Sequence, residues 1–273
     1  MSDMEQTTAS SNPGPSESRS GTAAKRNAFT ELMSSHNKQP KHTAPTPSKK
    51  PQYFGGRDGL GAYITNPESY PSDIVISHNA DFVAIHDMFP KSSLHLLLLP
   101  RDQTKTHLHP FEAFEDPEFL AKVRFEAQKL RSFAAAELRR KYGKYSMQEQ
   151  ERQIALSADP PPDELPVGRD WEKELMCGIH AVPSMNHLHV HVIAVDRYSD
   201  RLKHRKHYNS FATPFFVPLD DFPLAQSDPR REPTRQNYLK AEFTCWRCGK
   251  KFGNRFVELK SHLEQEFLEW RKL

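Results

Sequence analysis

The chain has 273 residues, of which 36% are hydrophobic and 22 are proline, with a formal net charge of +3. This length admits one sizeable domain beside something smaller, and the composition indicates extended or disordered segments outside the core. Three cysteines, two of them in a Cys-x-x-Cys pair, exclude a disulfide framework and favour a reducing compartment. The polar start and the short longest apolar run, Leu94 to Leu99, predict an intracellular protein without a membrane span.

Residues 1–50 are rich in Ser, Thr, Pro, Gly and Lys and are expected to form a disordered arm. Within this arm, a basic pair precedes apolar residues at helical spacing between Lys25 and Met33. This stretch is either a short helix that docks in a partner's groove or a chance apolar cluster. The pairs Lys25-Arg26 and Lys49-Lys50 are weak signals for nuclear import.

From residue 51 the pattern predicts an α+β domain. A short helix is expected near residues 58–64, and a long helix from 117 to about 145, where apolar residues including Phe125 and Phe133 recur near a 3.6-residue period. Alternating apolar runs predict a roughly five-stranded antiparallel sheet with the long helix on one face. Its expected strands are residues 73–77, 82–87, 94–99, 175–179 and 188–195.

Three histidines, His187, His189 and His191, alternate with aliphatic residues in the last of these strands. Successive side chains of a strand point to opposite faces, so the three imidazoles are expected to share one face. Neutral nitrogens grouped in this way either bind a metal or handle a phosphoryl group. The alternative is a row of polar residues on a solvated sheet face.

A basic segment follows the histidines directly. Seven Arg, Lys or His residues fall within residues 197–207, and aromatic residues follow them. A basic run is often only a solvated face, but its position favours binding of a phosphate backbone. The residues expected to contact nucleic acid are Lys203, Arg205 and Lys206.

The last segment has metal-ligand spacing. Cys245-x2-Cys248 is followed after thirteen residues by His262, which predicts a strand-turn-helix zinc finger holding a structural zinc ion. Glu266 lies four residues after His262, on the same helical face, and is the best candidate for the fourth ligand. Otherwise it is an ordinary exposed helix carboxylate.

The run from His187 to Ile193 resembles the signature of the histidine-triad nucleotide hydrolases and transferases, and residues 82–87 and 94–100 resemble the two strands that precede it. Together with residues 203–211 and the zinc finger, this combination resembles the aprataxin family, in particular its fungal forms. The resemblance covers the chain from about Tyr53 onward. It implies a histidine-triad catalytic domain at 51–213, followed by a linker and zinc finger at 214–273.

The resemblance implies a nuclear DNA 5′-adenylate hydrolase that removes AMP from abortive ligation intermediates during single-strand break repair. The nucleophile of the family corresponds to His189, which would form an adenylyl-histidine without a catalytic metal. The implied partners are nicked or 5′-adenylated DNA, with AMP as product, and a repair protein recruited by the N-terminal arm.

Further site residues are carried over by matching positions. His187 and His191 would flank the nucleophile, and His180 matches another active-site histidine. Asp87 would accept hydrogen bonds from the ribose hydroxyls, although it could simply cap a strand end, and His95 could be a hydrogen-bonded core residue. The residues matched to the adenylate and phosphate are Lys91, His95 and Ser184, and Lys206 would hold DNA or support the triad strand.

The chain departs from the family pattern at two places. Glu266 stands where animal aprataxins have a histidine. The helix that would carry an aromatic wedge against the DNA end is glycine-rich here, which leaves Tyr53, Phe54 or Leu60 as the stacking residue. Two other functions compete: a general histidine-triad hydrolase of dinucleotides or nucleoside phosphoramidates, and a non-catalytic nucleic-acid adaptor with a degenerate triad. The presence of all three histidines argues against the adaptor.

Overall fold

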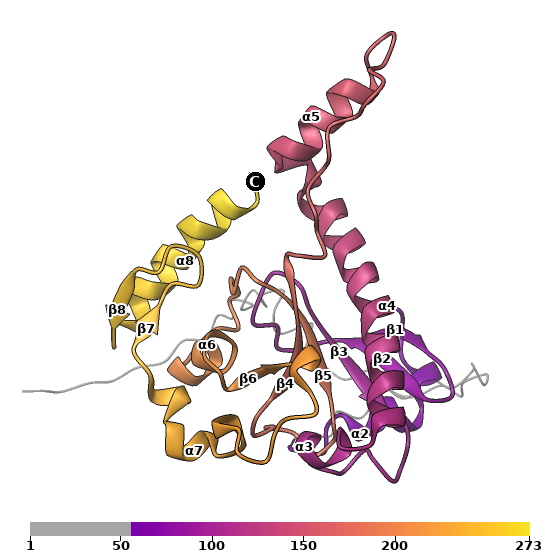
Figure 1. The fold of residues 1–273 in the computed structure, drawn as a ribbon, viewed down its shortest axis with the longest axis vertical. Coiled ribbons are helices and arrows are strands. Elements are labelled where there is room, and N and C mark those ends of the chain that lie inside the picture. The colour runs from indigo at the N-terminus through magenta and orange to yellow at the C-terminus, as the bar shows by residue number, and fades with distance from the viewer. Residues whose placement is uncertain (1–55) are drawn as a thin grey trace, which may run out of the picture. The chain divides into compact units, whose positions relative to one another are not determined.

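The computed structural model describes residues 56–273, so the predicted arm and the wedge candidates Tyr53 and Phe54 lie outside the described residues. Its centre is an antiparallel sheet of six strands in the order β1-β2-β3-β5-β4-β6 (Figure 1). The sequence predicted roughly five of these strands. The strands are β1 (Val75–His78), β2 (Phe82–His86), β3 (His95–Pro100), β4 (Leu175–His180), β5 (Val190–Ala194) and β6 (Phe216–Pro218).

The additional strand, β6, pairs with β4 from Gly178 to His180, so the sheet continues beyond residue 213, the domain boundary expected from the sequence. Both faces of the sheet are covered, which explains why β3 reads as an unbroken run of leucines. Leu96 and Leu98 belong to the large core cluster beneath the long helix. Leu97 and Leu99 belong to a second cluster with α2 (Gly61–Thr65).

The long helix α4 (Pro117–Tyr142) crosses one face of the sheet (Figure 1). The Asp116 carboxylate accepts hydrogen bonds from the first free backbone amides, and Pro117 occupies the first turn, where its missing N–H costs nothing. The predicted apolar face was wrong at two positions, because Phe125 is 64% exposed and Phe133 is 39% exposed. Phe125 lies two residues after buried Val123, which turns it to the opposite side of the helix.

The remaining elements are short. The sequence predicted the finger helix, and it is present as α8 (Phe256–Trp270), preceded by the hairpin of β7 (Phe243–Thr244) and β8 (Lys251–Gly253). Among residues 56–273 we find no helix that is both long and apolar enough to cross a membrane. The sequence did not predict the other helices, which are α3 (Pro110–Ala113), α5 (Met147–Leu156), α6 (Arg205–Ala212) and α7 (Pro233–Gln236).

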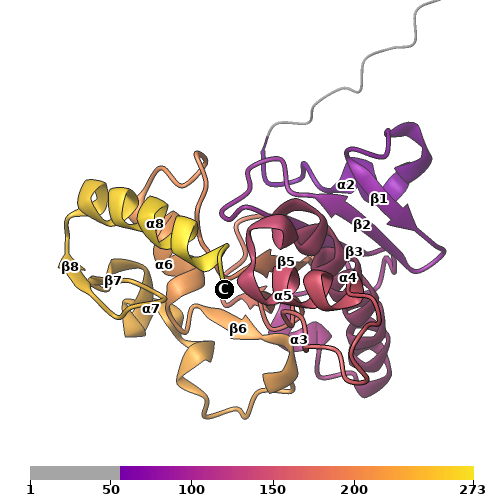
Figure 2. The same cartoon turned by 90° about the horizontal axis from the view of Figure 1, so that it is seen from above.

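Helix α8 contributes to two cores. Helix α8 lies beside α6 (Figure 2), and Leu259 and Leu263 pack in a cluster with Tyr208 of α6 and the finger residues. Phe267 and Trp270 in its second half belong to the large core cluster of the sheet. The finger therefore shares a helix with the sheet domain.

The pairing of β4 with β6 depends on a glycine. A Cβ atom at Gly178 would lie 2.3 Å from the backbone oxygen of Val217. We expect Gly178→Ala to lower the free energy of unfolding by about 1–3 kcal/mol, because backbone cannot yield as a flexible side chain does. In the matched control, Gly143→Ala, the new Cβ meets only ordinary contacts, the nearest at 3.6 Å. Urea denaturation of both variants checks this, and equal stabilities would contradict it.

A candidate active site of buried histidines

A cavity of about 790 Å³ opens where the loop after β2, the β4–β5 loop and α6 meet. Its size lies in the range of about 300–1,000 Å³ typical of small-molecule sites. The segment between α7 and the finger also contributes to its wall, through Asn237, Leu239 and Lys240. Eight of the site residues expected from the sequence line this cavity: Asp87, Lys91, His95, His180, Ser184, His189, His191 and Lys206.

His189 is held in one tautomer. Its Nδ1 lies 2.7 Å from the backbone oxygen of His187, and since a carbonyl can only accept, Nδ1 carries the proton. Nε2 therefore presents a lone pair from a ring that lines the cavity. The predicted strand began too early, because β5 starts only at Val190. The irregular backbone before it brings the His187 carbonyl within hydrogen-bond distance of His189 Nδ1.

The three triad histidines do not form one row. The rings of His189 and His191 are 4.9 Å apart, whereas His187 makes its ring contact with His107, at 4.6 Å. His187 also lies against α2, where a Cβ atom at Gly61 would approach its Nε2 to 2.8 Å. Gly61, which directly follows the stretch where a bulky wedge residue was expected, leaves room for the triad histidine His187.

A chain of polar contacts runs from Asp87 through His95 to His191. The Asp87 carboxylate lies 3.2 Å from His95 Nδ1, and His95 Nε2 lies 2.9 Å from His191 Nδ1. The Lys91 backbone N–H also donates to His95 Nδ1 at 3.3 Å, and a single hydrogen bond joins the His95 and His191 rings. The three groups lie close enough to ligate a metal. However, both nitrogens of His95 already have partners, and the hydrogen-bond chain accounts for the arrangement.

An aromatic wall backs the same histidines. The His180 ring lies 4.4 Å from the ring of His191 and 4.6 Å from that of Phe211. The Nε2 atoms of His180 and His191 are buried and have no hydrogen-bond partner within the described part of the chain. A buried polar atom without a partner is uncommon in a folded protein and marks a place where a ligand atom can complete the site.

Burial keeps these imidazoles neutral. Desolvation lowers the pKa of His95 to about 4 and moves the pKa values of His180 and His191 well below their usual range. Desolvation also lowers the pKa of His189, partly opposed by its hydrogen bond to the His187 carbonyl. At neutral pH the site therefore offers uncharged nitrogens, the form that attacks an electrophile.

Two further titratable side chains, those of Lys91 and His207, line the cavity. Burial is the largest cause that lowers the pKa of Lys91, with nearby Arg201 acting in the same direction and Asp87 opposing it. His207 of α6 also lines the cavity, and burial lowers its pKa to about 4. The sequence predicted His207 only as a member of the basic segment, because no spacing rule reveals which face of α6 meets the cavity.

The other predicted DNA contacts lie elsewhere. Lys203 is exposed and outside the cavity lining. The Arg205 guanidinium donates to the backbone oxygen of Ala241 at 2.6 Å and to that of Lys240 at 3.2 Å, and it stacks 4.4 Å from the Phe243 ring. These contacts favour a role in joining α6 to the finger over the predicted contact with DNA.

The segment before α2 is tied to the histidine loop. The Asn186 side chain donates to Asp58 at 2.7 Å and accepts from Arg57 at 2.9 Å, while its backbone N–H donates to the Arg57 carbonyl. Leu60, a wedge candidate, is only 6% exposed and packs in the second core cluster. It therefore cannot project from the surface as a stacking residue in this conformation.

The predicted zinc ligands meet where the β7–β8 hairpin faces α8. Donor atoms of Cys245, Cys248, His262 and Glu266 all lie within 4.8 Å of one another. His262 Nε2 is 3.1 Å from both Cys248 Sγ and a Glu266 oxygen. A tetrahedral zinc site separates its ligand atoms by roughly 3.3–3.8 Å, so the donor set fits a structural zinc ion after small adjustments. Arg247 holds the second Glu266 oxygen at 2.7 Å, which orients the carboxylate.

Comparisons with known proteins agree with both parts of the chain. A HIT domain model matches residues 69–198, and a C2HE / C2H2 / C2HC zinc-binding finger model matches residues 212–269. The C2HE description includes the ligand type expected at Glu266. It supports the carboxylate as fourth ligand over the exposed-carboxylate alternative.

Relatives match over nearly their whole length. An aprataxin-like protein of Schizosaccharomyces pombe is 36% identical over 89% of this chain and 94% of its own. An aprataxin-like protein of Saccharomyces cerevisiae is 37% identical over 77% and 95%. The crystal structure of aprataxin ortholog Hnt3 in complex with DNA superimposes with a TM-score of 0.63 at 34% identity, covering 78% of this chain and 96% of that one.

The buried neutral histidines make stability depend on pH. Their pKa values lie below that of the unfolded chain, so between pH 6.5 and about 4 the unfolded state binds more protons, and stability falls as the pH falls. We expect the free energy of unfolding to be lower at pH 5 than at pH 7, by on the order of 1 kcal/mol for each buried histidine. In His95→Gln this difference should shrink. Urea titrations at both pH values measure it, and an unchanged difference would refute the assignment.

Removing zinc should loosen the sheet domain as well as the finger, because α8 packs into both cores. We expect chelation to lower the melting temperature of the whole chain. Glu266→Ala should weaken zinc binding by more than about tenfold, whereas Glu266→His should restore it. Glu264→Ala, an exposed carboxylate of the same helix, is the matched control. Equal zinc affinity for Glu266→Ala and the control would remove Glu266 from the ligand set.

Proposed function

Because this chain belongs to the aprataxin family, with a histidine-triad domain followed by a zinc finger, we propose that it is a DNA 5′-adenylate hydrolase. The reaction would remove AMP from the 5′ phosphate of abortive ligation intermediates at strand breaks. The observation that carries this proposal is His189, whose hydrogen bond to the His187 carbonyl turns the Nε2 lone pair toward a nucleotide-sized cavity.

The reaction divides into two displacements. Nε2 of His189 attacks the AMP phosphorus, forming a P–N bond, while the bond to the 5′-phosphate oxygen of DNA breaks and that phosphate leaves as an anion. Water then attacks the adenylyl-histidine, the P–N bond breaks, AMP leaves and the extra water proton passes to solvent. The His187 carbonyl that accepts the Nδ1–H stabilises the positive charge that the ring gains on attack. Two easier steps replace one difficult step.

Other cavity residues have supporting roles in this proposal. The unpartnered Nε2 atoms of His191 and His180 belong to rings that line the cavity, and in the neutral Nε2–H tautomer they donate to phosphate oxygens. Lys91 and Ser184 lie at the rim, where the adenylate phosphate would enter. Asp87 is the proposed ribose acceptor, although its oxygens already contact His95 and the Phe89 amide. The chemistry needs no metal at this site.

DNA is the proposed leaving group. The structures of aprataxin ortholog Hnt3 with DNA, and with DNA and guanosine, support a nucleic-acid ligand for this chain. Lys206 lines the cavity mouth, and exposed Lys203 lies nearby in sequence, so both are proposed phosphate contacts without base specificity. We place the protein in the nucleus, in single-strand break repair, with residues 1–50 as the segment that recruits a repair partner.

Replacing the nucleophile tests the proposal. We expect His189→Ala to reduce release of AMP from a 5′-adenylated nicked duplex by at least about a thousandfold, because no other group can form the covalent intermediate. His78→Ala, an exposed histidine of β1, should retain activity. Acid-quenched wild-type enzyme should carry labelled adenylate on a histidine. Unchanged AMP release by His189→Ala would require a different nucleophile or the adaptor function.

The choice of substrate separates the proposal from a general dinucleotide or phosphoramidate hydrolase. For a DNA enzyme, kcat/KM for the adenylated duplex should exceed that for a free adenosine dinucleotide. It should also fall steeply with rising salt, because phosphate contacts release counterions. A preference for the dinucleotide at physiological salt would favour the general hydrolase.

A further inference from the structure

We propose that Arg169 is a positioning residue that clamps the end of the finger helix to the start of β4, and that it thereby sets the binding of DNA without taking part in chemistry at His189. The clamp is defined here as Arg169, Trp171, Glu174 and Trp270. The inference rests on the proposed function for its DNA substrate, but its contacts lie outside the cavity.

The Arg169 guanidinium lies against two indole rings. Its central carbon is 4.4 Å from the centre of the Trp171 ring and 4.7 Å from that of the Trp270 ring, and the two ring planes are perpendicular, at 89°. Its Nη1 donates to the Trp270 backbone oxygen at 2.8 Å, and Nη2 lies 3.1 Å from a Glu174 oxygen. The other Glu174 oxygen accepts the Trp270 indole N–H at 2.5 Å. One oxygen of the Glu174 carboxylate therefore binds Arg169, and the other binds Trp270.

This burial is informative because a charge removed from water is costly unless it is paired. The Arg169 side chain is only 3% exposed, and its partner Glu174 only 19%. A guanidinium is flat, so it packs against aromatic rings while its edge donates to oxygens in the same plane. A lysine ammonium cannot do both, which makes the geometry specific to arginine.

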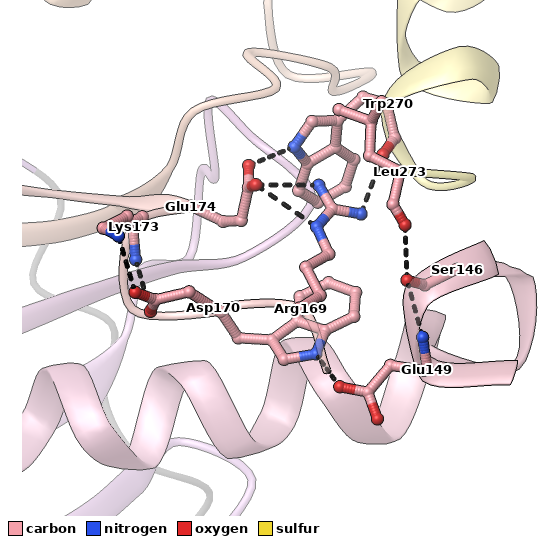
Figure 3. Close-up of polar contacts among 9 residues, drawn as sticks. Ser146, Glu149, Arg169, Asp170, Lys173, Glu174, Trp270 and Leu273 are labelled. Carbon is pink, nitrogen blue, oxygen red and sulfur yellow. Dashed lines mark hydrogen bonds and ion pairs between the residues drawn. The ribbon is translucent and has the colours of Figure 1, made fainter. Parts of the chain in front are cut away.

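The clamp joins segments that are far apart in sequence. Glu174 immediately precedes β4, and its carbonyl accepts the Val195 amide at the end of β5. Beyond Trp270, the Lys272 carbonyl accepts the Met147 amide, and the Leu273 carbonyl accepts the Ser146 hydroxyl (Figure 3). The end of α8 is thus held to β4 and to the start of α5.

The zinc ligands His262 and Glu266 lie on the same helix as the clamp. A helix of 15 residues spans about 22 Å, so a tilt of about 10° at the clamped end would displace the other end by about 4 Å. The segment leading into the finger lines the cavity through Asn237 and Lys240. A change in the orientation of α8 would therefore move this segment, and with it the surface that DNA contacts beside the cavity.

The experiment compares Arg169→Gln and Arg169→Lys with Lys173→Gln, a control in the same loop whose side chain is 82% exposed. We expect Arg169→Gln to raise KM for the adenylated duplex about tenfold, which corresponds to about 1.4 kcal/mol, with kcat changed less than twofold. Arg169→Lys should recover only part of this loss. Turnover of a free adenosine dinucleotide and zinc content should stay at the wild-type level in all three variants.

Amide hydrogen exchange gives a readout that is independent of activity. Residues 267–273 should exchange faster in Arg169→Gln, while β3 and β5 keep their protection. If Arg169→Gln does not fold, Glu174→Gln tests the same clamp with its volume preserved. The proposal is overturned if KM for DNA is unchanged, or if dinucleotide turnover falls as much as DNA turnover. If the wild-type enzyme does not act on adenylated DNA, the proposed function fails, and the affinity for unmodified nicked duplex then decides on the clamp.

Discussion

Desolvation of several imidazoles in one small volume is the constraint on which the site depends. Each ring that leaves water must stay neutral, and a neutral imidazole has one donor and one acceptor that need partners. The backbone and Asp87 supply some of these partners, and the His187 carbonyl selects the tautomer of His189. The remaining nitrogens, on His180 and His191, are left for a ligand. The ring nitrogens that can bind a ligand are therefore those for which the protein supplies no hydrogen-bond partner.

Local patterns carried much of the fold and the site. The zinc ligands follow from spacing within one short segment. The strand of His191 follows from its alternation with aliphatic residues, and that of His95 follows from an unbroken apolar run. The strand rule failed at His187 because it assumes regular backbone, and the chain bends before Val190, which brings the His187 carbonyl within hydrogen-bond distance of His189 Nδ1. The same bend fixes the tautomer of His189.

Features that depend on distant contacts could not be predicted. Strand β6 is three residues long and is defined by its pairing with β4, so its sequence carries little periodic signal. Arg205 was expected to contact DNA with its basic neighbours, yet its guanidinium donates to backbone carbonyls more than thirty residues away in sequence. Arg169 gave no signal at all, because its significance lies in two indole rings, one of them 101 positions further along the chain.

The sharing of α8 between two cores bears on how such a chain can evolve. A zinc finger that carries its own complete core can be duplicated, lost or moved between genes without harm to its neighbours. Here deletion of the finger would also remove Phe267 and Trp270 from the core cluster of the sheet domain and leave Arg169 a buried cation without the Trp270 ring. Recombination at the linker would therefore remove core contacts from both the sheet domain and the finger. The two parts should be inherited as one unit, and substitutions on either side of their contact should become fixed in pairs.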